Sequence, residues 1–201
     1  ATLAAAASAD KRLARGEGGT LTGVPIAHKD IFCTSGLRTS CASRMLDGFV
    51  PPYDATVIRQ LREADAVILG KTNIPDFSAD DTRTDSSWAG STFNAYDRTI
   101  VPGASSGGTA TAVAASFAVL GMAEETGGSI QNPASAQGLV GIKPTFGLIP
   151  NTGVTPFAAS TRDVLGPHAK TVYDAAIALD AIAGYTPEDP KTEPAIGNLP
   201  I

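Results

Sequence analysis

Residues 53–73 read YDATVIRQLREADAVILGKTN, and the two halves of this stretch follow different patterns. In the first half, apolar side chains recur at helical spacing, so one face of a helix would carry Val57, Ile58 and Leu61. Asp54 precedes them, where a helix N-cap residue is expected. In the second half, the short apolar run at 66–70 is typical of a buried strand. The stretch therefore predicts a helix followed directly by a strand.

The same order recurs on both sides of this stretch. Residues 24–32, VPIAHKDIF, predict a strand that leads into a loop. Residues 109–126, TATAVAASFAVLGMAEET, predict a helix of small residues and then a short strand. Residues 171–184, TVYDAAIALDAIAG, predict a helix that opens on a threonine–aspartate capping box and stops at a glycine. Alternating helices and strands are typical of a layered α/β domain with a largely parallel or mixed sheet.

The composition is that of a globular chain with a buried core. Of 201 residues, 43% are hydrophobic and 17% are charged, and the formal net charge is −5. No cluster of Lys or Arg stands out, so we expect neither nucleic acid nor a membrane as a partner. No apolar run reaches the length that spans a bilayer. Residues 1–19 lack a charged leader, so we interpret them as the end of an alanine-rich helix.

Cys33 and Cys41 are the two cysteines of the chain. They lack the further Cys or His ligands that a zinc site needs. We expect both to be reduced and to behave as small buried hydrophobic residues, which favours a reducing compartment and a cytoplasmic location. The sequence predicts no metal site and no cofactor.

Two short motifs are similar to known catalytic loops. Gly70–Thr72, GKT, would fit the end of a phosphate-binding loop, but that pattern needs a glycine where Asp65 stands, which excludes it. Gly103–Gly107, GASSG, matches the nucleophile elbow of α/β-hydrolases, with Ser105 as the nucleophile. That interpretation needs His168 as the base, although His168 stands just ahead of a predicted helix, where we expect a surface residue. An esterase that uses Ser105 and His168 is kept as an alternative.

Histidine is scarce in this chain, so a hydrolase would need another base, and Lys29 is a candidate. A lysine serves as a base when it is neutral, and loss of hydration on burial lowers a lysine pKa. Lys29 lies in an apolar stretch near the end of a predicted strand. In a strand, His28 and Asp30 would point to the opposite face, so Asp30 need not hold Lys29 in its charged form. The alternative is a solvated lysine at the end of the strand.

Five collinear segments together resemble the amidase signature family. They are GVPIAHKDIF at 23–32, AVILGKTNIPDF at 66–77, VPGASSGG at 101–108, ETGGSIQNPASAQGLVGIKPTFGLIP at 125–150 and LGPHAKTVYDAAIALDAIAG at 165–184. The resemblance implies an α/β/α layered fold around a mixed, twisted β-sheet, of which this chain would supply the N-terminal and central part. We expect a catalytic core at 1–184 and a proline-rich, linker-like tail at 185–201.

The resemblance also implies a Ser–cisSer–Lys catalytic site. Ser129 would attack the amide carbonyl, and Ser105 would bridge it to Lys29, which takes the proton. The peptide bond between Ala104 and Ser105 would be cis. Ser106 would support the site through hydrogen bonds.

A substrate site follows from the same resemblance. The backbone N–H groups of Thr126, Gly127, Gly128 and Ser129 would form the oxyanion hole, where each donor typically contributes about 100–1000-fold in rate. Two glycines in the loop would let these groups turn toward one point, and Gly107 and Gly108 would let the two serine loops approach each other closely. Ser78 would contact the substrate.

The chain departs from the family at three positions near this site. Glu125 stands where the family usually has aspartate and Gln131 where it usually has arginine, so a neutral hydrogen bond or another partner must replace an ion pair. Ala104 replaces a glycine. Members of the family are also roughly twice as long, within the upper range of single α/β domains. These differences leave the predicted chemistry intact and leave the substrate open.

We therefore expect an amidase that hydrolyses a carboxylic amide, carbamate or anilide through an acyl-serine intermediate. Its partner would be a small-molecule amide substrate, with a homodimer as a candidate assembly. Residues 27–46 and 51–56 also resemble the glutaminase-type subunit of a tRNA-dependent amidotransferase, whereas residues 74–88 and Gln131 do not. Such a glutaminase-type chain and an inactive fragment are further alternatives.

Overall fold

The computed structural model of the protein describes residues 2–158 and 161–197. Within them the main sheet has five strands in the order β2-β1-β5-β7-β6. Their bounds are β1 (Pro25–Lys29), β2 (Val67–Thr72), β5 (Leu120–Glu125), β6 (Val140–Gly141) and β7 (Val164–Ala169). β1 is parallel to both β2 and β5, whereas β7 is antiparallel to both β5 and β6. The sheet is therefore mixed, as the sequence predicted.

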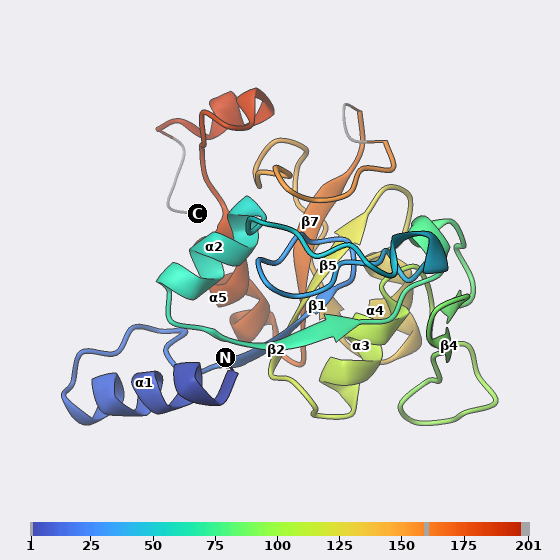
Figure 1. Ribbon diagram of the computed structural model, residues 1–201, viewed down its shortest axis with the longest axis horizontal. Coiled ribbons are helices and arrows are strands. Elements are labelled where there is room, and N and C mark those ends of the chain that lie inside the picture. Colours follow the sequence, from blue (N-terminus) through green and yellow to red (C-terminus); the bar gives the residue numbers. More distant parts are fainter. Residues whose placement is uncertain (1, 159–160, 198–201) are drawn as a thin grey trace.

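Helices cover both faces of this sheet, as Figure 1 shows: α2 and α5 lie on one side and α3 and α4 on the other. The α-helices are α1 (Thr2–Ala14), α2 (Thr56–Glu63), α3 (Gly107–Ala114), α4 (Gln131–Ala136) and α5 (Val172–Ile182). Short 3₁₀ segments occupy Arg44–Leu46, Asp76–Ser78 and Pro190–Ala195, and a small ribbon pairs β3 (Asp85–Ser86) with β4 (Gly90–Ser91). The α/β/α layered fold is confirmed.

The largest group of buried apolar side chains joins the sheet to α2 and α5. The three α2 residues that the sequence predicted to face inward are fully buried in it. Strands, α5 and the connecting segments supply the rest, and the cluster includes Val57, Ile58, Leu61, Ile26, Leu120, Met122, Leu165, Ala175, Ala178 and Ile182. Burial of one such side chain contributes roughly 1.5–3 kcal/mol, so this face of the sheet provides much of the stability of the fold.

The start of α2 differs from the prediction. Its N-cap is Ala55, which has no side-chain acceptor, and the predicted cap residue lies one position earlier. Asp54 instead accepts a hydrogen bond from the backbone N–H of Ser35 at 2.8 Å and pairs with Arg62 at 3.0 Å. The N-cap prediction was wrong because a tertiary contact to a distant loop competes for the same carboxylate.

The start of α5 agrees with the prediction. Thr171 is its N-cap, and the threonine hydroxyl accepts a hydrogen bond from the backbone N–H of Asp174 at 3.1 Å. The helix ends at Ile182, shortly before the glycine that the sequence pattern placed at its end. Local capping was therefore readable here because both partners lie within one turn of helix.

β2 carries one extra residue relative to β1. The second residue of β1 pairs with Ile68, but the third pairs with Gly70, which leaves Leu69 without a partner on β1. Each β2 side chain after such a bulge points to the opposite face of the sheet from the one it would occupy in an uninterrupted strand. Beyond it, Lys29 lies beside Thr72.

β7 is a strand that the sequence analysis did not predict. It contains Pro167, and proline is unusual between two neighbouring strands because it lacks an N–H donor. The Pro167 carbonyl accepts a hydrogen bond from the N–H of Ile142 at 3.2 Å, on the side of β6. Because the N–H and C=O of a strand residue point the same way, the missing donor also falls on this side, just beyond the two-residue β6. No hydrogen bond between β5 and β7 is lost.

The described part of the tail folds against the core. Thr192 is fully buried, and the Asp189 carboxylate accepts a hydrogen bond from the backbone N–H of Asn151 at 2.7 Å. A domain boundary at 184 stays a prediction, and positions 198–201 of the predicted tail lie outside the described residues.

Cys33 and Cys41 are free and buried, as the sequence predicted. Across the described ranges, none of the helices combines the length and apolarity needed to cross a bilayer.

The junction between α3 and β2 leaves no room for a side chain at Gly108. A Cβ there would lie 2.3 Å from the backbone oxygen of Asn73. We expect Gly108→Ala to lower the free energy of unfolding by about 1–3 kcal/mol because backbone must shift to accept the methyl group. Gly48→Ala is the matched control, since nothing lies within 4 Å of its Cβ. Urea denaturation of the two variants measures the difference, and equal midpoints would contradict the packing argument.

Candidate active site

The candidate site lies where three segments meet at one edge of the sheet. Lys29 is the last residue of β1, and Glu124 and Glu125 are the last residues of β5. Because β1 and β5 are parallel, their carboxyl ends lie at the same edge, where open α/β sheets usually bind ligands. Ser105 and Ser106 come directly before α3, which packs against both strands.

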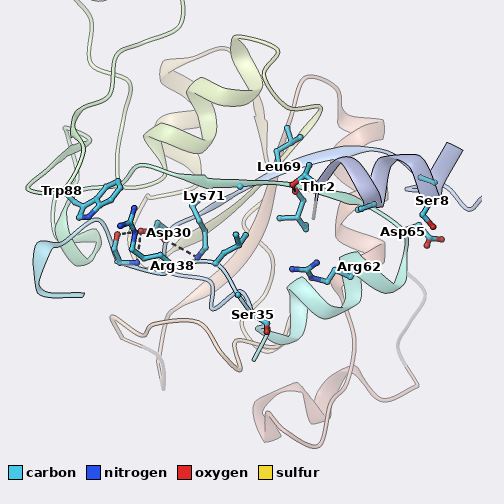
Figure 2. A pocket seen from close by; sticks show the side chains of 18 residues that line it. Thr2, Ser8, Asp30, Ser35, Arg38, Arg62, Asp65, Leu69, Lys71 and Trp88 are labelled. Atoms are coloured by element: carbon cyan, nitrogen blue, oxygen red, sulfur yellow. Dashed lines mark hydrogen bonds and ion pairs between the residues drawn. The ribbon is translucent and has the colours of Figure 1, made fainter. Parts of the chain in front are cut away.

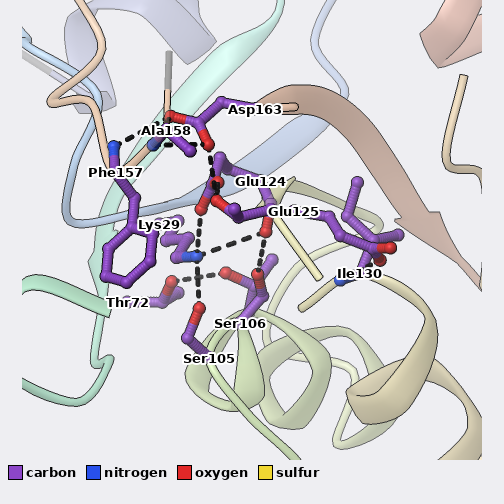
Figure 3. A network of polar contacts seen from close by, with 12 residues as sticks. Lys29, Thr72, Ser105, Ser106, Glu124, Glu125, Ile130, Phe157, Ala158 and Asp163 are labelled. Carbon is purple, nitrogen blue, oxygen red and sulfur yellow. Dashed lines mark hydrogen bonds and ion pairs between the residues drawn. The ribbon is translucent and has the colours of Figure 1, made fainter. Parts of the chain in front are cut away.

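The amine of Lys29 is the centre of a buried polar cluster, shown in Figure 3. The side chain has 0% exposure, and its Nζ lies 2.6 Å from the Ser105 Oγ and 2.6 Å from a carboxylate oxygen of Glu124. The Glu124 backbone oxygen is 3.2 Å away. Burial lowers the pKa of Lys29 because the ammonium loses its hydration, and the negative charge of Glu124 opposes that shift.

Asp30 points away from Lys29, as the strand alternation predicted. Its carboxylate accepts hydrogen bonds from the Ser40 hydroxyl at 2.5 Å and from the Ala42 N–H at 3.3 Å. It also pairs with Lys71 at 3.3 Å. Asp30 therefore anchors the loop after β1 and does not neutralise Lys29 directly.

The two serines before α3 make different contacts. The peptide bond between Ala104 and Ser105 is cis, as the resemblance implied. Ser105 is fully buried against Lys29. Ser106 donates its hydroxyl to the Glu124 carbonyl at 3.1 Å and its N–H to the Ser129 carbonyl at 3.3 Å. Ser106 thus ties the serine loop to β5 and to the loop that carries Ser129.

The glycines on either side of Ser105 and Ser106 do allow other segments to approach closely, but these are not the segments that were predicted. A Cβ at Gly107 would lie 2.1 Å from the Thr84 hydroxyl, and Gly108 packs against the Asn73 backbone. Gly103 is the residue that approaches the segment after the second loop, with a Cβ position 2.4 Å from the Cα of Pro133. The prediction that Gly107 and Gly108 bring the two serine loops together was therefore wrong in its partners.

Glu125 organises the loop that carries Ser129. One carboxylate oxygen accepts the backbone N–H groups of Ile130 at 2.9 Å and Gln131 at 3.0 Å. The other accepts the Gln131 side-chain amide at 2.7 Å. A neutral amide thus takes the place of the arginine, so of the two expected replacements for the ion pair, a neutral hydrogen bond or another partner, the structure contains the hydrogen bond.

The preceding N–H groups of the loop have no partner in the part of the chain that the structure describes. Within the described residues, the backbone N–H groups of Gly127, Gly128 and Ser129 donate to no protein acceptor. Gly128 has φ +112°, a conformation that side chains disfavour. Because Glu125 takes the next two N–H groups, these three remain available to a ligand, as an oxyanion hole requires.

A cavity of about 250 Å³ lies in front of these groups and is lined by residues of β5, of the loop that follows it and of the segment before α3. Its lining includes Ser78, Ser105, Glu124, Thr126, Ser129 and Arg162. The Ser78 Oγ is buried without a hydrogen-bond partner in the described structure, so it is free to meet a ligand. The Thr126 hydroxyl lies between the carboxylates of Glu124, at 3.0 Å, and Asp163, at 2.5 Å.

Only the first of the two predicted hydrogen bonds of the relay is present in the described residues. Lys29 contacts Ser105, but the hydroxyls of Ser105 and Ser129 are not hydrogen-bonded to each other. Ser129 has 5% exposure and faces the same cavity as Ser105. The roles of Lys29, Ser105 and Ser129 in catalysis therefore stay predictions.

Glu124 is the site residue that the sequence analysis missed. It has 3% exposure and contacts both Lys29 and Thr126. The signal was present as two consecutive glutamates at the end of a predicted strand. Successive strand residues point to opposite faces, so Glu124 and Glu125 had to serve different neighbours, and only one of them could serve the Ser129 loop.

His168 is not a surface residue, which corrects the prediction. It lies in β7 and is fully buried, and its Nε2 donates to the carbonyl of Ile130 at 2.8 Å. Burial lowers the pKa of His168 to about 4, so it is neutral near pH 7. The hydrogen bond to Ile130 occupies the imidazole N–H and gives no support to a pairing with Ser105.

A larger cavity, of about 710 Å³, lies elsewhere, between α1, β2 and the loop after β1 (Figure 2). It contains none of the predicted site residues. Its charged groups are paired with neighbours: Lys71 with Asp30 at 3.3 Å, and Arg38 over the Trp88 ring at 4.0 Å. We therefore place the candidate site in the smaller cavity, which is lined by serine and threonine hydroxyls and by Ser105 and Glu124, whose side chains contact the Lys29 amine.

Comparison with known proteins identifies the family. A sequence model of the amidase family matches residues 1–199. This chain belongs to the amidase family. The chain is 50% identical over 200 residues to a glutamyl-tRNA(Gln) amidotransferase subunit of Microcystis aeruginosa, in a match that covers 99% of this chain and 40% of that protein.

Two solved structures show the same relationship. The native peptide amidase from Stenotrophomonas maltophilia superposes with a TM-score of 0.91 at 41% identity, over 96% of this chain and 40% of that one. The corresponding glutamyl-tRNA(Gln) amidotransferase subunit of Thermotoga maritima gives 0.81 at 44% identity, over 85% of this chain and 37% of that one. The chain thus spans about two fifths of the length of these relatives.

The Glu125 carboxylate gives a testable stability effect. We expect Glu125→Ala to lower the free energy of unfolding by about 1–3 kcal/mol, because the fully buried Ile130 N–H loses its acceptor. Gln131→Ala is the control and should change stability by no more than about 0.5 kcal/mol, since that side chain is exposed. Urea denaturation measures both, and equal losses would show that Glu125 acts only through Gln131.

Proposed function

We propose that this amidase-family chain carries the catalytic centre of an amide hydrolase that works through an acyl-serine intermediate. The observation that carries the proposal is the 2.6 Å contact between the Lys29 amine and the Ser105 hydroxyl, beside a cavity that Ser129 also lines. A buried lysine next to a hydroxyl is suited to act as a base, because loss of hydration favours its neutral form.

In the proposed reaction the Ser129 Oγ attacks the carbonyl carbon of the amide. Its proton passes to Ser105 while the Ser105 proton passes to the neutral Lys29 amine. The tetrahedral intermediate collapses to the acyl-serine as the C–N bond breaks, and the leaving nitrogen takes a proton back along the same relay. Water then attacks the acyl-serine, loses its proton to the relay and releases the carboxylic acid.

The loop after β5 would stabilise the oxygen anion of both tetrahedral intermediates. The N–H groups of Gly127, Gly128 and Ser129 are unpaired within the described structure, and the hydroxyls of Ser78 and Thr126 line the same cavity. Donors that are already in place need no rearrangement when the charge develops, which is why they lower the barrier. Ser106 would act indirectly, by holding the serine loop to β5.

A second candidate function is favoured by the sequence relatives. Identity of 50% to a glutamyl-tRNA(Gln) amidotransferase subunit supports a glutaminase-type chain that releases ammonia from glutamine. The peptide amidase structure, at 41% identity, supports the first candidate, an amidase that acts on a small amide. Ammonia release from glutamine compared with that from an amidated dipeptide separates the two, and we expect the small amide to be the better substrate because Gln131 departs from the amidotransferase pattern.

A fluorophosphonate probe tests the proposed nucleophile. We expect peptide mapping by mass spectrometry to find the label on Ser129 and to find none in Ser129→Ala. Lys29→Met should slow labelling by about 100-fold or more, since general bases contribute roughly that much. Ser135→Ala is the control and should label at the original rate, because Ser135 is an exposed residue of α4 away from the relay.

Each alternative predicts a different labelling pattern. Label on Ser105 that disappears in His168→Gln would support the esterase and contradict the amidase. A chain that remains folded but takes no label at any serine would support an inactive fragment.

A further inference from the structure

Glu124 gives Lys29 a buried counter-charge that the proposed relay does not need. The Glu124 side chain has 4% exposure and that of Lys29 has 0%, and their charged atoms lie 2.6 Å apart. An ion pair this far from water is costly to form and strongly resists the loss of one partner's charge. The ion pair therefore affects the pH at which Lys29 becomes the neutral base that accepts a proton.

The contacts of the Lys29 nitrogen also constrain its orientation. Three oxygen atoms surround it: a carboxylate and a carbonyl of Glu124, which face it as acceptors, and the Ser105 hydroxyl, which can also donate. A neutral amine has two N–H groups and one lone pair. When Glu124 accepts both N–H groups, the lone pair is left facing Ser105, as proton transfer from Ser105 requires.

We propose that Glu124 is a positioning residue for Lys29: its carboxylate aims the amine at Ser105 and holds the amine's proton, so that the relay begins to operate only at a higher pH than it would with Lys29 alone. This proposal rests on the amide-hydrolase function proposed for this site. Its new content is that residue 124 sets the pH range of the reaction without touching the substrate carbonyl.

Other charged groups around Lys29 act on it more weakly than Glu124. Glu125 and Asp163 also favour its charged form, but neither contacts it. Across β5, His168 is neutral near pH 7, with a pKa of about 4. Arg162 and Asp81 line the cavity with opposite charges. Glu124 is therefore the carboxylate whose removal should change the titration of Lys29 most.

The test compares the pH dependence of fluorophosphonate labelling at Ser129 in the original protein and in Glu124→Gln. Glutamine keeps the shape and one acceptor oxygen but removes the charge. Because a nearby carboxylate stabilises the ammonium, its removal should move the acid limb of the labelling rate to lower pH, by about one to three pH units. On the acid side of the profile, Glu124→Gln should then react faster than the original protein, about tenfold for each unit of displacement.

Two further variants separate this effect from a general disturbance. Glu124→Asp keeps the charge and should keep the acid limb close to its original position. Glu125→Gln removes a charge from the adjacent residue, which holds the Ser129 loop, and should move the limb by less than Glu124→Gln does. A uniform loss of rate in Glu124→Gln with an unchanged midpoint would overturn the proposal and leave Glu124 with a structural role.

A direct titration distinguishes failure of this proposal from failure of the proposed function. The ¹⁵N resonance of the Lys29 side chain, assigned by its disappearance in Lys29→Met, reports the charge of the amine whether or not the protein reacts. A lower midpoint in Glu124→Gln supports the coupling even if Ser129 takes no label, and equal midpoints overturn it even if Ser129 is labelled. Absence of label from Ser129 at every pH would count against the proposed function alone.

Discussion

The candidate site depends on one constraint, which is that a lysine amine is buried without contact with water. A buried ammonium needs partners for its N–H groups and for its charge. The fold supplies them by placing the ends of β1 and β5 side by side, so that Glu124 offers both its carboxylate and its carbonyl to Lys29. The third partner, Ser105, comes from the turn before α3, which is fixed to the same carbonyl through Ser106.

The neighbouring carboxylate, Glu125, solves a different problem. Its carboxylate accepts the backbone N–H groups of Ile130 and Gln131, at the start of α4. These two N–H groups are therefore not available to the carbonyl groups of the loop. The three N–H groups just before them have no acceptor within the described residues. Adjacent residues of one strand therefore organise the two halves of the candidate site: Glu124 contacts the Lys29 amine, and Glu125 holds the loop that carries Ser129.

Much of this arrangement was readable from the sequence. Periodicity placed α2 and β2, because Val57, Ile58 and Leu61 repeat at helical spacing and a short apolar run follows. Strand alternation correctly turned Asp30 away from Lys29. The resemblance to the amidase signature family predicted Lys29, Ser105 and Ser129 at one site; Lys29 contacts Ser105, Ser129 lines the same cavity as Ser105, and the chain does belong to the amidase family. Their catalytic roles stay a proposal.

The failures have physical causes that a sequence pattern does not contain. Asp54 suits a helix cap, but a loop N–H from Ser35 competes for its carboxylate. A proline such as Pro167 normally indicates that a segment is not an inner strand. Here the N–H that proline lacks would point past the end of β6, which has only two residues, so no pairing is lost. The burial of His168 and the contact between Lys29 and Glu124 both depend on which strands become neighbours in space. Pairing of distant strands is a tertiary property, and local preferences do not determine it.

The bulge at Leu69 also determines which residue of β2 neighbours the buried amine. With an uninterrupted register, Lys71 would sit directly beside Lys29, at the separation of neighbouring strands, about 4.8 Å. Two ammonium groups would then compete for Glu124 and repel each other in a region without water. The extra residue places Thr72 there instead and sends Lys71 to Asp30 on the other face. One unpaired leucine thus keeps two basic side chains in separate electrostatic environments.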